Sequence, residues 1–562
     1  MKRKSYLSIL MMAVIFAFSS CNKQMGPLSP DLFKSTPNPL EAKGGKVEAS
    51  IEATIPAKYF NKKAEVTVTP VLVFAGKEIS GNAIQLQGEK VRANGQVISY
   101  IEGGKAIIPV SFVYEEAMRS SELFLSFEVK QGNKTYQLPR VKVADGVLST
   151  SEIATAESST PAFAADKFQT SLKNAYKANI LFLIQQAEVR DSELKSADVQ
   201  ELEKNIKETT TTPNKKLTGI EVSSYASPDG SLELNTKLAE KREKNTVDYL
   251  NSELKKNNLT TTVDSKFTAE DWDGFKELMA QSNIQDKDLV LRVLSTYTDP
   301  AEREQQIKNI SVAFGNIAKD ILPQLRRSRL TATFNIIGKS DAELTKLAKE
   351  NPKALTVEEL LYSATIAGAN KAAIYQSATE LFPSDYRGYN NLGAINYQQG
   401  KLAKAESLYN EAKALNNSPE VSYNLGLIAL NKKDVNKAEE LFGKAAGAEG
   451  LGEGLGVLYL KRGQYEKAVS AFGELKSNNA ALAQILTKNY NKAKSTLSAV
   501  AAPDAKTSYL MAVVGARTNN ESMVLTNLKD AISKNKGLAQ KALTDVEFSR
   551  FAKNLDFAKL VQ

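Results

Sequence analysis

Two hydrophobic patterns divide this chain of 562 residues. Between Lys46 and Leu148, short runs of alternating or continuous apolar residues stand between Gly and Asn turns, a pattern that predicts β-strands. From Thr356 onward the alternation stops, and apolar residues recur at helical spacing. Strand and helix patterns are mixed between these two parts. We therefore expect several domains: an N-terminal β-sandwich, a central α/β domain and a C-terminal array of helices.

A proline interrupts one predicted strand of the N-terminal part. Pro70 lies inside the apolar run Ala64–Phe74. Because proline donates no hydrogen bond to a neighbouring strand, it indicates a sheet edge or a bulge. The N-terminal part shows no recognisable site chemistry, so we expect a spacer or docking module there.

The stretch from Ile220 to Leu250 is the most informative in the chain. It begins with an alternating strand, Ile220–Tyr225, and breaks at the turn residues Ser227–Gly230. A helix then follows, whose apolar stripe consists of Leu234, Leu238, Val247 and Leu250. A strand, a tight turn and an amphipathic helix are thus predicted in succession.

This stretch resembles the C-terminal, peptidoglycan-associating domain of the OmpA family. The residues that carry the resemblance are Gly230, Asn235, Leu238, Arg242 and the segment from Val247 to Leu250. The resemblance implies an α/β fold in which a turn aspartate and a helix arginine grip the charged end of the peptidoglycan stem peptide. Arg242 occupies the arginine position. Ser227 stands where the family has its aspartate, and the nearest acid is Asp229.

The candidate peptidoglycan-binding residues are therefore Ser227, Asp229, Asn235 and Arg242. A zwitterionic amino acid carries an ammonium and a carboxylate, so its receptor needs an acid and a base, and the planar fork of arginine fits the carboxylate. Two alternatives stay open. Arg242 can be a solvated charge on a polar helix face, and Asp229 can be a turn former, because Asp-Gly favours turns.

The N-terminus has the composition of a targeting segment. Met1–Lys4 is charged, Tyr6–Phe18 is apolar but short for a membrane span, and Ser19–Cys21 offers a small-residue cleavage site. The segment resembles a bacterial lipoprotein signal peptide, with cleavage before Cys21 and lipid on its sulfur. The resemblance implies an outer-membrane lipoprotein that faces the periplasm. An ordinary secretory peptide with an incidental cysteine is the alternative.

The densest basic cluster of the chain consists of Arg326, Arg327 and Arg329. It directly precedes Leu330–Ile337, the predicted last strand of the central domain. We interpret these arginines as solvated loop charges or as contacts to an anionic polymer. Upstream of them, helices opening near Trp272 and after Asp299 indicate an insertion into the central domain.

The C-terminal helices contain an internal repeat. In three copies, a glycine is followed by an alanine and then by an aromatic residue at constant spacing. The triplets are Gly393, Ala405 and Tyr409; Gly426, Ala438 and Phe442; and Gly456, Ala468 and Phe472. This pattern resembles the tetratricopeptide repeat (TPR), which places small residues where paired helices cross closely. The resemblance implies binding of protein partners; ordinary helical hairpins with chance spacing are the alternative.

Composition excludes several kinds of chemistry. The chain has no histidine and one cysteine, which excludes Ser-His-Asp and Cys-His catalysis, histidine-ligated metals and an intrachain disulfide. The net charge of +9 is spread over 73 basic and 64 acidic residues, without a basic patch interleaved with aromatics. This balance fits an anionic envelope polymer or lipid surface and gives no indication of nucleic acid. We expect no catalytic residue, no cofactor and no metal.

The composition and the patterns together give domain boundaries. These are a lipoprotein signal peptide at 1–20, a proline-rich tether at 21–44, the β-sandwich at 45–148, a linker at 149–174, the OmpA-like domain with its helical insertion at 175–340, TPR repeats at 354–500 and a helical continuation or cap at 501–562.

These parts predict a non-enzymatic, lipid-anchored scaffold of the outer membrane. Its expected partners are the membrane through the N-terminal lipid, peptidoglycan through the OmpA-like domain, and proteins through the repeats. An alternative is an accessory subunit of an outer-membrane assembly or secretion complex whose OmpA-like domain no longer binds peptidoglycan. A wall-metabolising enzyme is a third possibility, although no paired acids stand in a recognisable motif.

Overall fold

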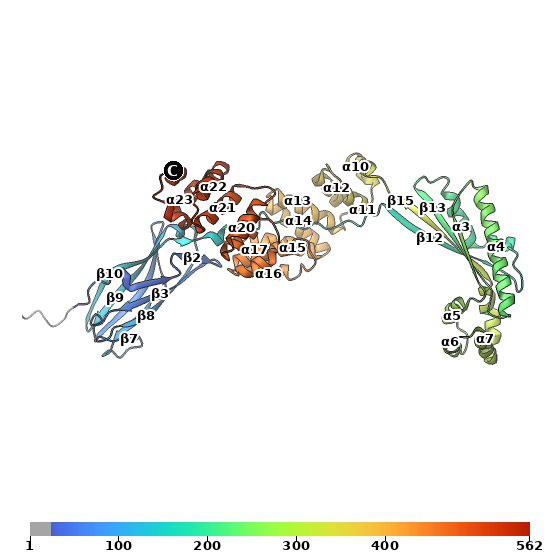
Figure 1. The fold of residues 1–562 in the computed structure, drawn as a ribbon, viewed down its shortest axis with the longest axis horizontal. Coiled ribbons are helices and arrows are strands. Elements are labelled where there is room, and N and C mark those ends of the chain that lie inside the picture. Colours follow the sequence, from blue (N-terminus) through green and yellow to red (C-terminus); the bar gives the residue numbers. More distant parts are fainter. Residues whose placement is uncertain (1–23) are drawn as a thin grey trace, which may run out of the picture. The chain divides into compact units, whose positions relative to one another are not determined.

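The computed structural model describes residues 24–562, and Figure 1 shows its ribbon. The predicted signal peptide at 1–20 and the predicted lipidation site Cys21 lie outside the described residues. The chain forms two compact units. The first ends at Ala165 and resumes from Asn370 to Gln562, and the second comprises Asp166–Ala369. Within the described part, no helix has the length and apolar character needed to cross a membrane.

The N-terminal part of the first unit consists of two sheets that enclose a hydrophobic core. One sheet contains β1 (Phe33–Thr36), β2 (Leu40–Lys43), β3 (Lys46–Ile55), β8 (Gly104–Val113) and β11 (Val147–Leu148), in the order β1-β3-β2-β11 with β8 also paired to β3. The other contains β4 (Ala64–Phe74), β5 (Lys77–Ser80), β6 (Ile84–Gly88), β7 (Gln96–Ile98), β9 (Ser121–Gln131) and β10 (Lys134–Asp145), in the order β10-β9-β4-β6-β7 with β5 also paired to β4. The β-rich architecture expected for this part is present, and its strands alternate between buried and exposed residues, most regularly in β8.

The prediction of a tether at 21–44 is wrong for residues 33–43. Strands β1 and β2 both pair with β3, and Phe33, Leu40 and Ala42 are buried in the core between the sheets. Each strand is only four residues long, so its alternation is too short to stand out beside the prolines. Pro37 and Pro39 lie in the connection between the two strands.

Pro70 lies neither at a sheet edge nor at a bulge. Strand β4 pairs with β9 along its whole length without a register shift. On its other side, β6 pairs only up to Val68, and β5 begins to pair at Val71. Proline is therefore tolerated in an inner strand because it occupies the gap between two successive partners.

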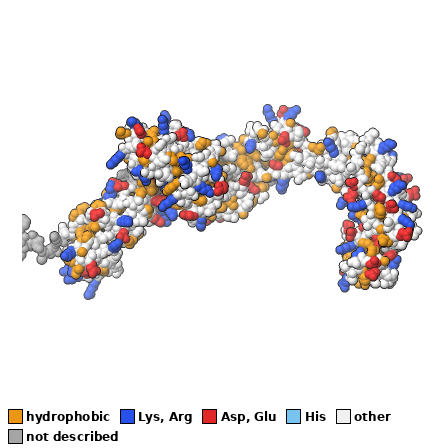
Figure 2. Space-filling model, in the orientation of Figure 1, with side chains coloured by type: hydrophobic (Ala, Val, Ile, Leu, Met, Phe, Trp, Pro, Cys, Tyr) orange, Lys and Arg blue, Asp and Glu red, His pale blue; other side chains and the backbone are white. Residues whose placement is uncertain are grey.

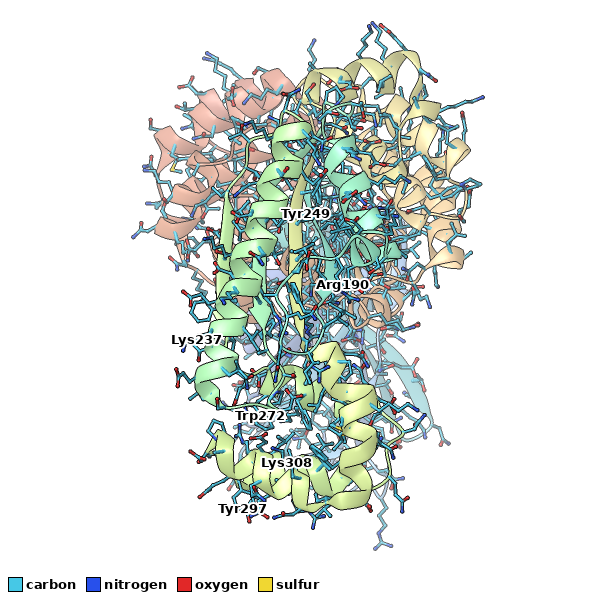
Figure 3. All side chains as sticks on the ribbon, turned by 90° about the vertical axis from the view of Figure 1, so that its right-hand side faces the viewer. Arg190, Lys237, Tyr249, Trp272, Tyr297 and Lys308 are labelled. Carbon is cyan, nitrogen blue, oxygen red and sulfur yellow. The ribbon has the colours of Figure 1, made fainter. Side chains whose placement is uncertain are left out.

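The second unit contains a four-stranded sheet covered by two helices on one face (Figures 1 and 3). The strands are β12 (Ser171–Leu181), β13 (Lys215–Tyr225), β14 (Val263–Thr268) and β15 (Arg327–Ile337), in the order β12-β15-β13-β14, and the helices are α3 (Ala197–Glu208) and α4 (Leu232–Lys256), with the short α2 (Asp191–Leu194) before them. Leu202 and Leu250 of the helices pack with Leu330 and Phe334 of the sheet. The first strand begins at Ser171, inside the segment 149–174 that was expected to be a linker.

A helical subdomain follows β14, as the sequence predicted. It comprises α5 (Trp272–Gln281), α6 (Lys287–Thr296), α7 (Pro300–Asn309), α8 (Ser311–Asn316), the π-helical turn Ile317–Ile321 and α9 (Leu322–Leu325). Its helices enclose a core of their own, and Figure 3 labels Trp272, Tyr297 and Lys308 on this subdomain. The Asp299 carboxylate accepts the Glu302 N–H at 2.9 Å and caps α7. Helices α10 (Asp341–Glu350) and α11 (Val357–Ser363) end the unit.

The first unit resumes with antiparallel helix pairs. They are α12 (Lys371–Leu381), α13 (Tyr386–Gln398) and α14 (Leu402–Leu415), α15 (Pro419–Asn431) and α16 (Val435–Phe442), α17 (Leu451–Lys461) and α18 (Tyr465–Phe472), α19 (Asn478–Leu486) and α20 (Tyr490–Ser498), and α21 (Ala505–Arg517) and α22 (Glu521–Lys534), followed by α23 (Gly537–Thr544) and α24 (Leu555–Val561). The close crossing predicted at the repeat glycines is present. A Cβ on Gly393 would lie 2.7 Å from the Tyr409 ring, so only glycine lets the paired helix approach. Lysine and arginine are interspersed with acids on the face drawn in Figure 2.

Candidate functional site

One pocket of the second unit contains all four candidate peptidoglycan-binding residues. Ser227 and Asp229 lie in the turn after β13, and Asn235 and Arg242 lie on the first half of α4. Arg326, directly before β15, joins them in the lining. The turn forms because Ser231 caps α4 by accepting the Leu234 N–H, which fixes where the helix begins.

Arg326 and Asp229 form the charged centre of this pocket. The Arg326 Nη2 lies 3.0 Å from Asp229 Oδ2, and its Nε donates to the Ser227 hydroxyl at 3.1 Å. The Ser227 hydroxyl in turn donates to Asp229. The Ser227 hydroxyl therefore helps to hold a neighbouring acid. Asp229 is both a residue of the turn and an acid that faces a base.

Asn235 connects the turn to the helical subdomain. Its Nδ2 donates to the Gly230 carbonyl at 3.0 Å and to Glu270 Oε1 at 3.2 Å. The side chain is buried. Asn235 thereby orders the turn beside Asp229. Its bond to Glu270 connects the turn to the residues just before α5.

Arg242 is not a solvated charge. Its side chain is 1% exposed, and its guanidinium donates to the carbonyls of Gln186 (3.0 Å), Tyr225 (2.8 Å) and Leu183 (3.3 Å). It also lies 5.1 Å from the Phe182 ring centroid. Burial, with a smaller contribution from the positive charge of Arg326, lowers the pKa of Arg242 to about 10. Arg242 thus ties the connection between β12 and α2 to the end of β13 from inside the pocket wall.

The basic cluster at the start of β15 is not a set of solvated loop charges. Arg326 pairs with Asp229 in the pocket, and Arg327 forms a buried ion pair with Asp271 at 2.8 Å. Arg329 lies 3.7 Å from Glu277 and is the most exposed of the three. The sequence marked Arg326 as basic but gave no sign that the chain would fold it against Asp229. Its position at the start of a central strand, beside the strand that ends at the turn, is the only signal that could have indicated this.

The pocket is small in this state. Its volume of about 40 Å³ holds a few water molecules. A carboxylate ligand would reach Arg326 by taking the place of Asp229, and an ammonium group would be received by the freed acid.

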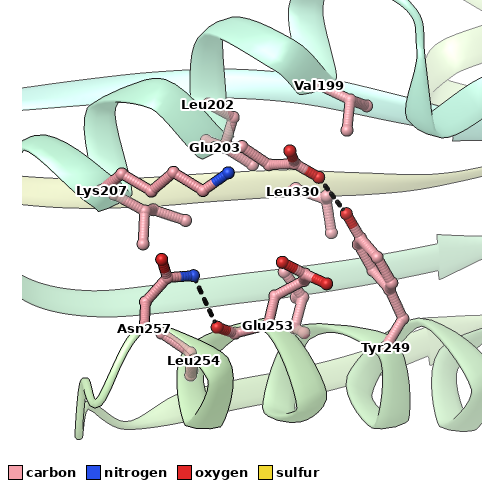
Figure 4. Close-up of a pocket in the computed structure, with 11 residues that line it drawn as sticks. Val199, Leu202, Glu203, Lys207, Tyr249, Glu253, Leu254, Asn257 and Leu330 are labelled. Carbon is pink, nitrogen blue, oxygen red and sulfur yellow. Dashed lines mark hydrogen bonds between the residues drawn. The ribbon is translucent and has the colours of Figure 1, made fainter.

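A second crevice of this unit offers no site chemistry. It lies between α3 and α4 and is lined mainly by apolar side chains, including Leu202 and Leu254 (Figure 4). Its volume of about 10 Å³ admits at most one water molecule. Tyr249 donates to Glu203 across it. Burial, together with this hydrogen bond, raises the pKa of the tyrosine. Among residues 24–562, no group of acids or thiols is arranged to hold a metal ion.

A second candidate site lies on the repeats of the first unit and already holds a segment of the same chain. We call residues 154–165 the strap. The prediction of a linker is wrong for this segment, because it runs along the first helices of successive pairs. The strap has no helix or strand of its own and turns at Ala156–Ser159, where the Ser159 N–H donates to the Ala156 carbonyl at 2.9 Å. Its alanines at 154, 156, 162 and 164 are all buried against the helices. Phe163 contacts Tyr375, with ring centroids 6.2 Å apart.

Three asparagines hold the strap by its backbone. Asn424 accepts the Ala162 N–H and donates to the Ala162 carbonyl, both at 2.8 Å. Asn391 pairs with Ala164 in the same way, at 2.7 and 2.9 Å. Asn479 pairs with Thr155, at 3.4 and 2.8 Å. Each side-chain amide therefore imitates the pairing that a neighbouring β-strand would provide.

The asparagines occupy equivalent positions of the repeat. Asn391 and Asn424 lie two residues before the repeat glycines Gly393 and Gly426, and Asn479 lies two residues before Ala481. The intervening copy has Gly454 at this position. We define Asn391, Asn424 and Asn479 as the asparagine ladder. The strap passes from the later repeat to the earlier one, antiparallel to the order of the helices.

Other buried groups complete the strap contacts. Glu453 Oε2 accepts the Thr160 N–H at 3.0 Å, and the Tyr423 hydroxyl donates to the Thr160 carbonyl at 3.1 Å. The Tyr397 hydroxyl donates to the Ala156 carbonyl, and Asn390 donates to the Ala162 carbonyl at 3.1 Å. Burial raises the pKa of Glu453, an effect that the Thr160 N–H opposes.

The sequence analysis missed this site. Its signal is a polar residue recurring inside buried helices, at the same distance from the glycine that marks each repeat. Asparagine is unfavourable in a helix interior, so its recurrence there indicates a partner outside the helix. The strap itself, rich in Ala, Ser and Thr, has the composition of a linker.

Comparisons with known proteins bear on the repeats. Residues 370–419 and 419–449 each match the family described as "Tetratricopeptide repeat". The TPR repeats predicted from the sequence are thus confirmed. No curated protein matches the chain.

Several solved structures are similar to parts of this chain. A tetratricopeptide repeat protein from Parabacteroides merdae ATCC 43184 is 17% identical, with 48% of this chain and 97% of that chain covered and a TM-score of 0.25. Pseudomonas aeruginosa pilF is 15% identical, with 38% and 99% covered and a TM-score of 0.27. Yeast Tom70 is 12% identical, with 59% and 78% covered and a TM-score of 0.25.

Proposed function

We propose that this protein is a non-enzymatic scaffold of the bacterial envelope. Its repeats bind protein partners, its α/β unit associates with peptidoglycan in the manner of an OmpA-like domain, and lipid on Cys21 holds it in the outer membrane, facing the periplasm. TPR repeats support the first part, because helix-pair arrays present extended surfaces to proteins and rarely carry catalysis.

The convergence of Ser227, Asp229, Asn235 and Arg242 in one pocket carries the proposal of wall binding. These residues were selected from the sequence by resemblance alone. The donors of Arg242 are used by backbone carbonyls. Arg326, which lines the same pocket, is therefore the arginine that can contact a ligand carboxylate. In the proposed complex, Arg326 receives the carboxylate of the stem peptide, Asp229 receives its ammonium group, and Arg242 and Asn235 hold the turn in place.

With a lipid anchor, weak contacts to peptidoglycan would be sufficient to keep the chain at the wall. Tethering raises the effective concentration of one site for another into the millimolar range when the connection is short. A modest affinity of the pocket for the stem peptide would then keep the chain between membrane and wall, while the repeats stay available to a protein partner.

One observation favours a second function. In the described state Asp229 and Arg326 neutralise each other, and the Ser227 hydroxyl supports their contact. A pocket closed in this way fits an accessory subunit of an outer-membrane assembly or secretion complex, in which the α/β unit serves only as a structural part.

Sedimentation with purified peptidoglycan sacculi distinguishes the two functions. The variants are Arg326→Ala and, as a matched control from the same basic cluster but outside the pocket, Arg329→Ala. We expect the wild type and Arg329→Ala to cosediment alike, and Arg326→Ala to be retained at least tenfold less. Equal retention of all three chains, or retention of none, would contradict wall binding through this pocket and favour the accessory subunit.

A further inference from the structure

Through the asparagine ladder, the repeat surface recognises the backbone of the segment that it binds. Each of its three side chains contacts both the N–H and the C=O of one strap residue. Such contacts are the same for any amino acid except proline. The ladder therefore selects an extended conformation and leaves the side chains of the bound segment to other contacts.

Most strap side chains that face the helices are small, and the exception is Phe163 against Tyr375. The alanines at 154, 156, 162 and 164 are each at most 3% exposed, whereas Glu157 and Ser158 are exposed. Burying one methyl group contributes only about 0.8 kcal/mol. The backbone pairs therefore contribute substantially to the binding of the strap, and another segment could form them equally well. A suitable replacement needs small residues where the strap has its buried alanines.

The strap is also covalently close to the surface that it covers. A segment joined to its receptor by a short connection is present at an effective concentration in the millimolar range. A free peptide at micromolar concentration would not displace it. A partner could do so only by binding additional surface or by forming more contacts.

We propose that the strap is a resident ligand of the repeat surface, and that a partner protein binds there by inserting its own extended segment in place of the strap. The segment has small residues in alternate positions and free backbone N–H groups opposite Asn391, Asn424 and Asn479. This inference rests on the proposal that the repeats bind protein partners and specifies how the surface is regulated: the chain blocks its own site until a competing segment enters.

A labelled peptide tests the exchange. The probe is a fluorescent peptide with the sequence of residues 153–166, added to the chain from residue 24 to 562. In the variant Ala162→Arg/Ala164→Arg, two long charged side chains replace methyl groups that are almost completely buried, so the strap is expelled. The matched control is Glu157→Arg/Ser158→Arg, which changes exposed positions of the same strap.

We expect the expelled-strap variant to bind the probe saturably, at least tenfold more tightly than the wild type or the control. Adding Asn391→Ala and Asn424→Ala should abolish this binding. A probe N-methylated at the positions of Ala162 and Ala164 lacks the N–H donors and should bind at least tenfold less. An expelled-strap variant that retains its helical circular dichroism but binds no probe, or that binds the N-methylated probe equally well, would overturn the proposal.

Hydrogen exchange of the wild type gives an independent test if the expelled-strap variant does not fold. A resident ligand leaves without unfolding its receptor, so the amides of Thr155, Thr160, Ala162 and Ala164 should exchange at least tenfold faster than the core amides of α15. Equal protection would make the strap a permanent part of the core and overturn the proposal. Neither readout needs a natural partner or peptidoglycan. A negative result would therefore count against the strap proposal itself and can be distinguished from failure of the proposed function.

Discussion

The side-chain amide of Asn424 pairs with both backbone groups of Ala162, although the two residues belong to segments that are far apart in the sequence. The oxygen accepts the N–H and the nitrogen donates to the C=O, each at 2.8 Å. Asn424 also donates to Asn390 at 3.0 Å. Both partners are buried, so no water replaces these bonds when the asparagine is removed.

Replacing Asn424 by alanine is expected to lower the free energy of unfolding of the repeats by about 2–3 kcal/mol. The change orphans the Ala162 N–H and the Asn390 oxygen, and each unsatisfied buried group costs about 1–3 kcal/mol. Urea denaturation followed by circular dichroism measures the effect. Asn416→Ala, at an exposed position of the preceding helix end, should change the stability by less than about 0.5 kcal/mol. Similar losses in both variants would contradict the role given to the ladder.

Replacing Gly393 by alanine is expected to destabilise the repeats by about 1–2 kcal/mol. The new methyl group would lie 2.7 Å from the ring of Tyr409, and overpacking costs about 1–3 kcal/mol, which exceeds the gain of up to about 1 kcal/mol from helix propensity. Gly443→Ala is the control, because the nearest atom to its Cβ is 3.4 Å away and its backbone is right-handed helical. The expected order of thermal midpoints is Gly443→Ala at or above the wild type and Gly393→Ala clearly below it. The reverse order would show that the helices do not cross as described.

Arg517 and Glu547 form an ion pair at 2.6 Å near the C-terminal end, where the carboxylate is almost completely buried. Replacing Arg517 by methionine leaves the buried Glu547 carboxylate without an ionic partner and with the Thr150 hydroxyl as a hydrogen-bond donor, which costs about 3–5 kcal/mol. The double variant Arg517→Met/Glu547→Gln removes that charge and should recover more than half of the loss. Thermal unfolding of both variants tests this, and a double variant less stable than the single one would refute it.

The stability of the first unit should depend on pH through Asp545. Burial raises the pKa of this carboxyl, while a hydrogen bond from Tyr509 opposes the shift. Between the ordinary pKa of an aspartate and the raised value, the folded chain binds more protons than the unfolded chain, so stability falls as pH rises through this window. Asp545→Asn removes the charge and keeps an acceptor for Tyr509.

The free energies of unfolding of the wild type and Asp545→Asn, measured from pH 4 to pH 8, isolate this contribution from that of other groups. As pH rises, the free energy of unfolding of Asp545→Asn should increase relative to that of the wild type. The total increase should be about 1.4 kcal/mol for each unit by which folding raises the pKa of Asp545. A difference that is constant with pH, or that shrinks as pH rises, would contradict the assignment.

The order of strand-rich, mixed and helical parts could be predicted from hydrophobic periodicity, because each part repeats its pattern many times. The repeat glycines could be predicted as well, since close helix crossing leaves no alternative at Gly393. Strands β1 and β2 could not, because four residues give too little alternation to outweigh the prolines between them.

The candidate site was predictable only in part. Resemblance selected Ser227, Asp229, Asn235 and Arg242, and the chain brings them together. Arg326 completes the pocket only because β15 lies beside β13, a pairing between segments that no local pattern specifies. The strap was missed because its hydrogen bonds come from asparagines of repeats far away in the sequence. In addition, a linker and a bound segment can have the same composition of small residues.

Isothermal titration of the chain from residue 24 to 562 with a soluble peptidoglycan stem peptide tests the central claim, wall association through the Arg326 pocket, most directly. We expect saturable binding at a 1:1 ratio that is lost in Arg326→Ala and preserved in Arg329→Ala. Absence of heat at millimolar peptide, or equal binding by Arg326→Ala, would contradict the claim and leave a scaffold that acts through its repeats.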